Sequence, residues 1–434
     1  MSEAVNTDYL DCLLKSWSTK SNEPLSWLHQ LRARAIDHVS AQRLPTKRDE
    51  DWRFTDISAL ARLSYQSAQP HDDLQAQDIE HLHIKEAKNS LVFVDGYYSA
   101  QLSTIIDSAA LEIGNLPELL LTHGTILESH LGQYAKFDNN VFAALNTAFL
   151  RDCALIIVPK NTVIEEPVHL LFIATQKEVT SYPRCLIIGE SGSEITFIED
   201  YVSLQDAAYV TNSLTEISLS ANAHASHIRI QRESTQAYHM ANCAVSIAHG
   251  SNYQSVSISL GAQISRYDLD VQLIAEAAEC AIDGLALISG SQLADTHTCI
   301  DHMKPNGTSR QQHKCIVNDR AHAVFNGKII VRPHAQQTNS SQSSRNLLLS
   351  KTAQVDTKPQ LEIFADDVKC AHGATVGQLD QEEIFYLESR GLSETTARSL
   401  LTYAFGAEII NRIPVISLRQ QLEQTVLTQT KNNK

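Results

Sequence analysis

Two side chains near the C-terminal end of the chain have types and spacing that could do chemistry. Cys370 and His372 stand two residues apart in Asp-Asp-Val-Lys-Cys-Ala-His-Gly-Ala-Thr-Val-Gly, residues 366–377. In a β-strand, residues i and i+2 point to the same face, with Cα atoms about 7 Å apart. A thiolate beside an imidazole can bind a soft metal or an iron–sulfur cluster, or act as a sulfur nucleophile.

The residues next to this pair differ in whether they favour a reactive thiolate. Gly373 and Gly377 would let another backbone approach closely. Lys369 would favour a thiolate, whereas Asp366 and Asp367 oppose it. Cys-x-His alone is a weak signal, so the rest of the chain must decide what the pair does.

A second group of candidate metal ligands lies earlier in the chain. His297, Cys299 and His302 cluster with Asp295 and Asp301, a set that could bind a metal if alternate residues share a face. We favour the simpler interpretation that these residues cover the solvent face of a β body.

The remaining histidines are interpreted as structural. His313 and Cys315 repeat the i, i+2 spacing, but packing residues are the simpler explanation. His322 and His334 bracket a strand predicted near residues 325–331 and are interpreted as turn residues rather than ligands.

Composition narrows the classes of partner. The 434 residues include 35 basic and 50 acidic side chains, for a net charge of −15. This excess argues against nucleic acid or an anionic membrane as the main partner. No apolar run approaches the roughly 20 residues that span a bilayer, and residues 1–8 lack the pattern of a signal peptide. We therefore expect a cytoplasmic protein.

Motifs for common enzyme chemistry are missing from the sequence. None of the eight cysteines forms Cys-x-x-Cys, which argues against a disulfide framework or a zinc ribbon, and most should be reduced and buried. The chain has no P-loop, no Gly-x-Gly-x-x-Gly and no Gly-x-Ser-x-Gly motif. If ATP drives this protein, a partner must hydrolyse it.

Both ends of the chain are predicted to be helical. Leu10, Leu13, Leu14 and Trp17 form one apolar stripe, and a second helix is predicted from about residue 26 to 40. A strand over residues 90–98 should end in a turn at Asp95-Gly96. Near the C-terminus, Asp380 and Ser393 are predicted to begin helices.

Between these ends, strand patterns dominate from about residue 150 to 377. Apolar residues recur at intervals of 33, 28, 26 and 34, at positions Ile195, Ile228, Val256, Ile282 and Ile316. A period near 30 suits a β-solenoid, although a sandwich of meandering strands fits almost as well. The polar stretch over residues 336–346 could be a loop or a polar rung.

Several motifs towards the C-terminus resemble the SufB/SufD family of iron–sulfur cluster assembly proteins. The dense match spans about 90 residues and includes His322-Ala-Val-Phe-Asn-Gly-Lys, Ser344-Arg-Asn-Leu-Leu-Leu-Ser, Asp356-Thr-Lys-Pro-Gln-Leu-Glu-Ile, the Cys370 stretch, Phe385-Tyr-Leu-Glu-Ser-Arg-Gly and Ala404-Phe-Gly-Ala-Glu. Asp51-Trp-Arg-Phe-Thr-Asp and Val92-Phe-Val-Asp-Gly look like N-terminal landmarks of the family. The form Cys-x-His-Gly-Ala-Thr-Val-Gly is closest to the SufD subunit.

The resemblance implies a mainly β fold. It implies a right-handed parallel β-helix core at 149–378, flanked by a mostly helical N-terminal domain at 1–148 and a C-terminal helical domain at 379–434. It also implies a complex with SufB and the ATPase SufC, with the C-terminal helices docking SufC. The edge that pairs with SufB could also pair with a second copy of this chain.

For chemistry, the resemblance implies a non-enzymatic scaffold that helps to build a transient iron–sulfur cluster. His372 would contribute to a cluster or iron site shared with SufB, and Cys370 would be a ligand, a sulfur carrier or a packing residue. The neighbourhood Ser344-Arg345-Asn346 lacks the cysteine that SufB places there, and Ala371 stands where a serine is expected. A reduced flavin is also implied, with no residues to place it.

Two alternatives come from other functional classes. A β-helix carbohydrate lyase or esterase would share the solenoid but would normally be exported. An interaction-only scaffold subunit would hold SufC without contacting the cluster. Co-purification with an ATPase subunit would separate both scaffold interpretations from the lyase.

Overall fold

A computed structural model describes residues 8–17, 26–106 and 111–431 of the chain. Residues 1–7 lie outside these ranges, and they make up most of the segment in which no signal peptide is predicted. None of the described helices is long and apolar enough to span a membrane.

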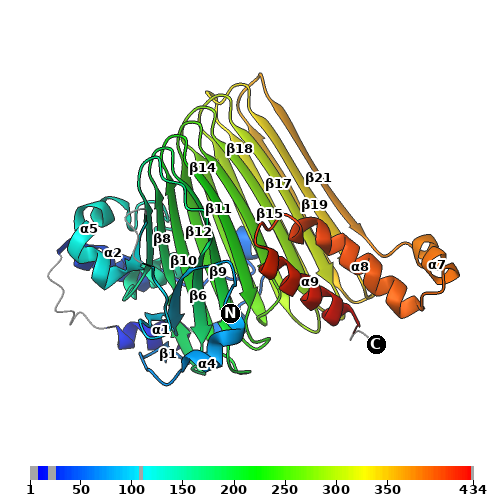
Figure 1. Cartoon of the computed structure of the whole chain (residues 1–434), viewed down its shortest axis with the longest axis horizontal. Coiled ribbons are helices and arrows are strands. Elements are labelled where there is room, and N and C mark those ends of the chain that lie inside the picture. The colour runs from blue at the N-terminus through cyan, green and yellow to red at the C-terminus, as the bar shows by residue number, and fades with distance from the viewer. Residues whose placement is uncertain (1–7, 18–25, 107–110, 432–434) are drawn as a thin grey trace, which may run out of the picture.

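The centre of the molecule is a parallel β-solenoid of about eight turns (Figure 1). Successive strands alternate between two sheets, so neighbours within a sheet come from consecutive turns. Parallel pairing of this kind confirms the predicted solenoid and excludes the sandwich.

Sheet A contains 11 strands among the described residues. From the C-terminal end of the solenoid these are β20 (Gln354–Ile363), β18 (His322–Val331), β16 (Leu293–His302), β14 (Ile264–Leu273), β12 (Tyr238–Ile247), β10 (Val210–Leu219), β8 (Arg184–Gly189), β5 (Ala154–Val158) and β4 (Glu112–Asn115), with β7 (Val179–Ser181) and β1 (Gln66–Ser67) to one side.

Sheet B contains 10 strands in the same part of the chain. In the same direction these are β21 (Lys369–Gly377), β19 (Asn339–Leu348), β17 (Thr308–Val317), β15 (Glu279–Ile288), β13 (Asn252–Ser259), β11 (His224–Arg232), β9 (Glu194–Ser203), β6 (Val168–Ala174), β2 (Asn89–Val94) and β3 (Tyr97–Tyr98).

The repeat near 30 residues is confirmed, but the alignment of individual residues is mostly wrong. Ile228 does lie opposite Val256, whereas Ile195 lies opposite Ala225. The cause is that sheet B is apolar on both faces. Ile195 belongs to the solenoid interior, whereas Ile228 packs under the C-terminal helices.

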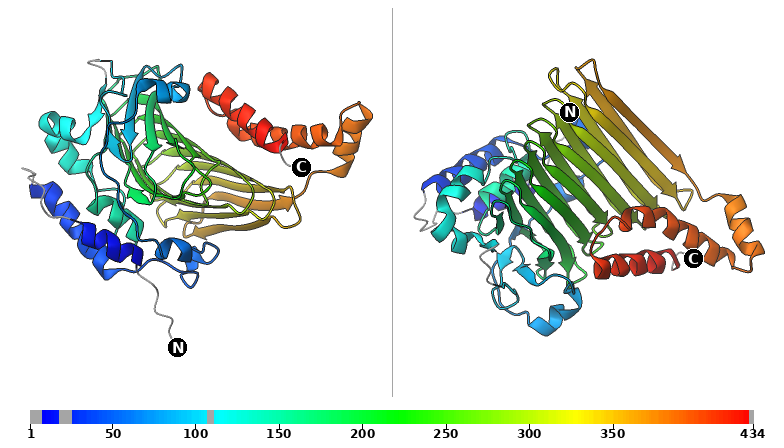
Figure 2. Two further views of the ribbon diagram at one scale, coloured as in Figure 1. Left: turned by 90° about the horizontal axis from the view of Figure 1, so that it is seen from below. Right: turned by 45° about the horizontal axis from the view of Figure 1, so that its top comes forward.

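Helices cover the outer face of each sheet (Figure 2). The N-terminal helices pack on sheet A through α6 (Val141–Ala148), which contacts β10 and β12. The C-terminal helices pack on sheet B, where α8 (Glu394–Ile410) contacts β15 and β17.

The bounds of the helices follow the predicted pattern at both ends. The N-terminal part contains α1 (Asp8–Ser16), α2 (Ser26–Ala41), α3 (Ser58–Ala61), α4 (Ala76–Ile79), α5 (Leu116–His130) and α6 (Val141–Ala148), with 3-10 turns η1 (Glu50–Trp52) and η2 (Glu80–Leu82). The C-terminal part contains α7 (Gln381–Ser389), α8 (Glu394–Ile410) and α9 (Ile416–Lys431). The side chains of Asp380 and Ser393 accept hydrogen bonds at the starts of α7 and α8.

The two ends of the solenoid differ. At the N-terminal end, the short antiparallel strands β3 and β4 flank the sheets, and Asp95 and Gly96 form the predicted turn with φ of 50° and 90°. At the other end, β20 and β21 have a free edge, because no further strand pairs with them in the described residues. Unpaired N–H and C=O groups therefore line this open end.

The expected domain limits at residues 148/149 and 378/379 stay predictions. Strands β2 and β4 precede residue 148, yet both pair within the two sheets. The solenoid thus draws on some residues that the sequence assigns to the N-terminal region.

Candidate functional site

Cys370 and His372 lie on β21, the last strand of sheet B, as the strand prediction requires. Backbone register sets Cys370 opposite Ser340 and His372 opposite Gln342. Cys370 packs against the apolar interior of the solenoid, so His372, two residues on, faces the same side. Cys370 is half-buried and His372 is exposed, because no further turn covers them.

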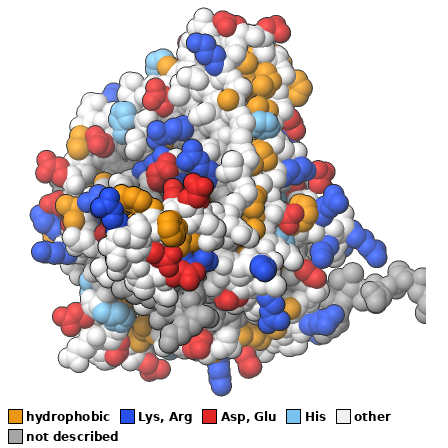
Figure 3. Space-filling view, turned by 90° about the vertical axis from the view of Figure 1, so that its right-hand side faces the viewer, with side chains coloured by type: hydrophobic (Ala, Val, Ile, Leu, Met, Phe, Trp, Pro, Cys, Tyr) orange, Lys and Arg blue, Asp and Glu red, His pale blue; other side chains and the backbone are white. Residues whose placement is uncertain are grey.

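The end of the molecule that carries α7 and β21 is seen in Figure 3. Hydrophobic side chains gather in a strip on this face, with histidine side chains beside them. Exposed apolar residues at this end include Ile363, Phe364 and Val376. An exposed strand edge next to apolar side chains is a surface that a partner could cover.

The strand beneath the pair is a polar rung. β19 coincides with the low-complexity stretch, which settles the choice between loop and rung. The inward side chain of Ser340 lies 2.7 Å from Ser309 Oγ, which lies 2.8 Å from His302 Nε2. Directly below Cys370, the interior is therefore a hydrogen-bonded column.

Burial raises the pKa of the Cys370 thiol, and a backbone hydrogen bond from Ser340 offsets this in part. The thiol form is thus favoured in the free chain, and Lys369 does not reverse this. Among the described residues, no three His, Cys, Asp or Glu side chains come together to hold a metal ion. The pair by itself can be only part of a metal site.

Residues 344–346, where the resemblance implies a missing cysteine, offer no substitute ligand. Ser344 and Asn346 are buried, and the Asn346 side-chain amide donates to Ser344 Oγ and to the Thr375 carbonyl. Arg345 faces outward, 3.9 Å from Glu408 of α8. These three polar side chains therefore already have hydrogen-bond or ion-pair partners within the chain.

The group around His297 does not form one cluster. His297 and Cys299 face the outside of sheet A, and His297 Nε2 lies 3.0 Å from Asp295 Oδ1. His302 faces inward and is fully buried. The expectation that the whole group covers the solvent face is therefore wrong for His302 and for the buried Asp295.

The other histidines have structural surroundings. His313 is buried inside the solenoid and stacks on Phe325 at 4.4 Å, and Cys315 is also buried. His322 begins β18 rather than a turn, and its Nε2 lies 2.7 Å from Asp356 Oδ2 on the next strand. His334 is exposed between β18 and β19.

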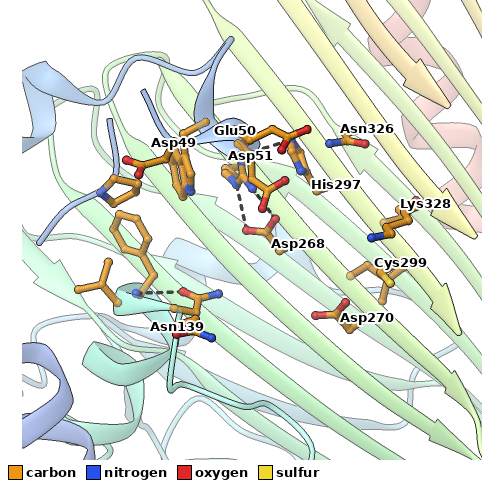
Figure 4. A pocket seen from close by; sticks show the side chains of 18 of the residues that line it. Asp49, Glu50, Asp51, Asn139, Asp268, Asp270, His297, Cys299, Asn326 and Lys328 are labelled. Carbon is orange, nitrogen blue, oxygen red and sulfur yellow. Dashed lines mark hydrogen bonds and ion pairs between the residues drawn. The ribbon is translucent and has the colours of Figure 1, made fainter. Parts of the chain in front are cut away.

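A cavity of about 920 Å³ lies between the N-terminal segment and the outer face of sheet A (Figure 4). Sequence reasoning missed it, although Asp51 and Trp52 of the landmark at residues 51–56 line it. Trp52 lies 4.0 Å from the Arg266 guanidinium, and Thr55 donates to Asp295 at 2.6 Å. This landmark therefore fastens the N-terminal segment to the outside of sheet A.

The cavity does not fit the implied flavin. Its cations are already paired: Arg43 with Asp49, Arg266 with Asp268 and Asp295, and Lys328 with Glu362. Burial, with Asp268 and Asp51 nearby, raises the pKa of Asp270 to about 6. A flavin diphosphate needs free cations or N–H donors. Such a net acidic lining would repel it.

Comparisons with known proteins agree with the fold and the motifs. Residues 172–405 match the family model "SUF system FeS cluster assembly, SufBD core domain", and residues 3–170 match "SufBD protein N-terminal region". An iron–sulfur cluster assembly SufBD family protein from Synechocystis is 39% identical over 96% of this chain and 94% of its own.

Two further relatives extend the comparison. The iron–sulfur cluster assembly protein SufD of Escherichia coli is 35% identical over 87% of this chain and 88% of its own. A chloroplastic protein of Arabidopsis thaliana, ABCI7, is 30% identical over 92% of this chain and 85% of its own. The solenoid, the motifs and these full-length matches lead to one conclusion: the chain belongs to the SufB/SufD family of iron–sulfur cluster assembly proteins, and it is SufD-like.

Proposed function

We propose that this chain is the SufD-type subunit of a SufBCD scaffold and gives His372 and Cys370 to an iron or cluster site shared with SufB. The observation that carries the proposal is the position of both side chains on the free edge strand β21. A partner strand added to this edge would bring its own ligands next to them. Two ligands on an open edge suit a site that is completed by a partner better than a site built by this chain alone.

The chemistry of the two side chains suits a cluster under construction. Imidazole nitrogen and thiolate sulfur are both iron ligands. Because the pKa of Cys370 is raised, its deprotonation would accompany metal binding. The cluster is a product that the complex passes on, so in this proposal the chain is a scaffold rather than an enzyme. We place this scaffold in the cytoplasm.

The C-terminal helices are the proposed docking surface for the SufC ATPase. α7 projects beyond the sheets (Figure 1), and Phe385 and Tyr386 on it are 71% and 57% exposed. A hollow of about 420 Å³ lies beside them, between Asp380, Leu387 and Leu401. SufC would hydrolyse the ATP, and its closure would move the two solenoids against each other.

An interaction-only subunit is the second candidate. The exposed apolar side chains of α7 favour it, since they fit a subunit that anchors SufC without touching a cluster. The two proposals differ only in whether Cys370 and His372 are needed.

The test is a complex reconstituted with SufB and SufC, with iron loading and cluster absorbance as readouts. His372→Ala should lower iron loading and cluster absorbance at least about tenfold. Loss of a residue that only hydrogen-bonds to a metal ligand typically lowers metal affinity about ten- to hundredfold, and loss of the ligand itself should lower it more. Cys370→Ser should lower both readouts if the thiol is a ligand or sulfur carrier. His334→Ala, exposed on the same turns, and Cys299→Ser, on the outer face, are the matched controls.

The outcomes separate the candidates. Normal assembly with His372→Ala would contradict the cluster role. Normal assembly with Cys370→Ser alone would leave that residue a packing role. Full assembly with both residues replaced, together with SufC co-purification, would establish the interaction-only subunit.

A further inference from the structure

A second hydrogen-bonded column in the polar rung ends directly below His372. Gln342 on β19 donates from Nε2 to Gln311 Oε1 at 2.7 Å. Gln311 in turn donates from Nε2 to Thr298 Oγ1 at 2.6 Å. Each amide in the column donates away from the open end, so an acceptor atom is left at the top.

That acceptor, Gln342 Oε1, is buried and has no hydrogen-bond partner. The Gln342 side chain is only 3% exposed, and it fits because Gly327 on sheet A has no side chain. A Cβ at Gly327 would lie 2.3 Å from Gln342 Nε2. A buried acceptor without a donor costs about 1–3 kcal/mol, so a donor brought to it would be stabilised there.

The nearest inward side chain on the open side is that of His372. The register sets Gln342 opposite His372, and aligned residues on neighbouring strands lie about 4.8 Å apart. The His372 ring is exposed and has no hydrogen bond to another described residue, so it can rotate towards Gln342. An imidazole N–H is the donor that the column lacks.

We propose that Gln342 is a positioning residue for His372: its Oε1 accepts one ring N–H, fixes the tautomer and turns the other ring nitrogen to the open end. Ligand histidines commonly donate their second nitrogen in this way, which orients the ring. The inference rests on the proposed function, because it gives the freed nitrogen to iron. Gln342 itself would not touch the metal.

The first test reads the tautomer directly in the full-length isolated chain. Nitrogen-15 labelling of histidine, with His372→Gln to assign the signal, reports which ring nitrogen carries the proton. The wild-type ring should be held in one tautomer. Gln342→Leu should leave the two tautomers averaged, and Gln342→Glu, which keeps an acceptor, should restore a single one. Identical His372 signals in the wild type and Gln342→Leu would overturn the proposal.

Gln311→Leu is the matched control for damage to the column. It removes the acceptor of Gln342 Nε2 but leaves Gln342 Oε1 in place, so the His372 tautomer should persist. If Gln342→Leu fails to fold, Gln342→Glu and Gln311→Leu still decide the question. Averaged tautomers in Gln342→Glu, with Gln311→Leu unchanged, would then count against the proposal.

The second test uses Fe²⁺ loading of the complex with SufB and SufC. Gln342→Leu should weaken loading about tenfold, the effect typical of a lost outer partner, and Gln342→Glu should recover it. If His372→Ala has no effect, the proposed function itself fails. If His372→Ala lowers loading but Gln342→Leu does not, only the positioning role is lost.

Discussion

At the scale of single residues, strand parity decides what each histidine can do. His302 and His313 have inward positions inside covered turns and are buried. His372 also has an inward position, but on the last turn, where it is exposed. One residue type thus packs in the interior and, under our proposal, supplies a ligand at the rim.

Acid should destabilise the fold through two of the buried histidines, His302 and His313. Burial lowers the pKa of His302 to about 4 and that of His313 to about 3. Below about pH 6.5 these histidines bind protons in the unfolded chain but stay neutral in the folded chain. The free energy of unfolding therefore decreases as pH falls towards 4. At pH 5 each histidine should cost about 2 kcal/mol.

Urea unfolding at pH 7 and pH 5 measures this effect. In His313→Gln, the stability difference between the two pH values should shrink by about 2 kcal/mol. His334→Gln, at an exposed site, should keep the wild-type difference. An unchanged pH difference in His313→Gln would show that its ionisation is not coupled to folding.

At the scale of elements, the strands of sheet B differ in how their two faces are used. Most are apolar inside and also apolar outside, where α8 and α9 pack. β17 and β19 are exceptions, because serine and glutamine side chains of both strands lie in the interior. These strands give the last turns a polar interior below the candidate site.

Crowding between β18 and β19 predicts a sharp contrast between two glycines. A Cβ on Gly327 would meet Gln342 Nε2 at 2.3 Å and Phe325 Cζ at 2.7 Å, whereas a Cβ on Gly373 would meet nothing within 4 Å. Gly327→Ala should lower the free energy of unfolding by about 1–3 kcal/mol. Gly373→Ala should stay within about 0.5 kcal/mol.

Chemical denaturation of the isolated chain checks both variants. Equal stability of the two would mean that the interior can relax around a methyl group at residue 327. The space at Gly373 is the room for a close backbone approach that the sequence predicts. A partner, rather than this chain, would have to fill it.

At the scale of the whole molecule, the asymmetry of the solenoid sets where partners can bind. Short antiparallel strands flank one end, and the other ends in the free edges of β20 and β21. The C-terminal helices cover sheet B and project α7 near this open end (Figure 2). A SufB-type partner at the edge and SufC on the helices would therefore not compete.

A charge at the open end should block the partner without harming the fold. Val376 is 50% exposed on β21, and an inward-facing lysine discourages strand pairing. Val376→Lys should weaken binding to SufB at least about tenfold, which is 1.4 kcal/mol. Its unfolding midpoint should match the wild type.

Val163→Lys is the control, because Val163 is 58% exposed and lies outside the two edge strands. Titration by size-exclusion chromatography or calorimetry gives the affinities. If the two variants bind SufB equally well, the open end is not the interface. The same measurement without SufB shows whether the isolated chain pairs with itself through this edge.

The sequence by itself determined a mainly β centre, the period near 30 and the strand that carries Cys370 and His372. Local pattern left the solenoid and the sandwich open, and only the resemblance carried by the dense motifs favoured the solenoid. The register was not predictable, because apolar residues on both faces of sheet B hide which face is inside.

Only the tertiary structure decided which side chains meet. It separated His302 from His297 by placing them on opposite faces of one strand. It turned a low-complexity stretch into the polar rung under the site, because hydrogen bonds to other turns satisfy its amides. It left Cys370 and His372 at an uncovered edge, since contacts between turns are set by distances that no local pattern records.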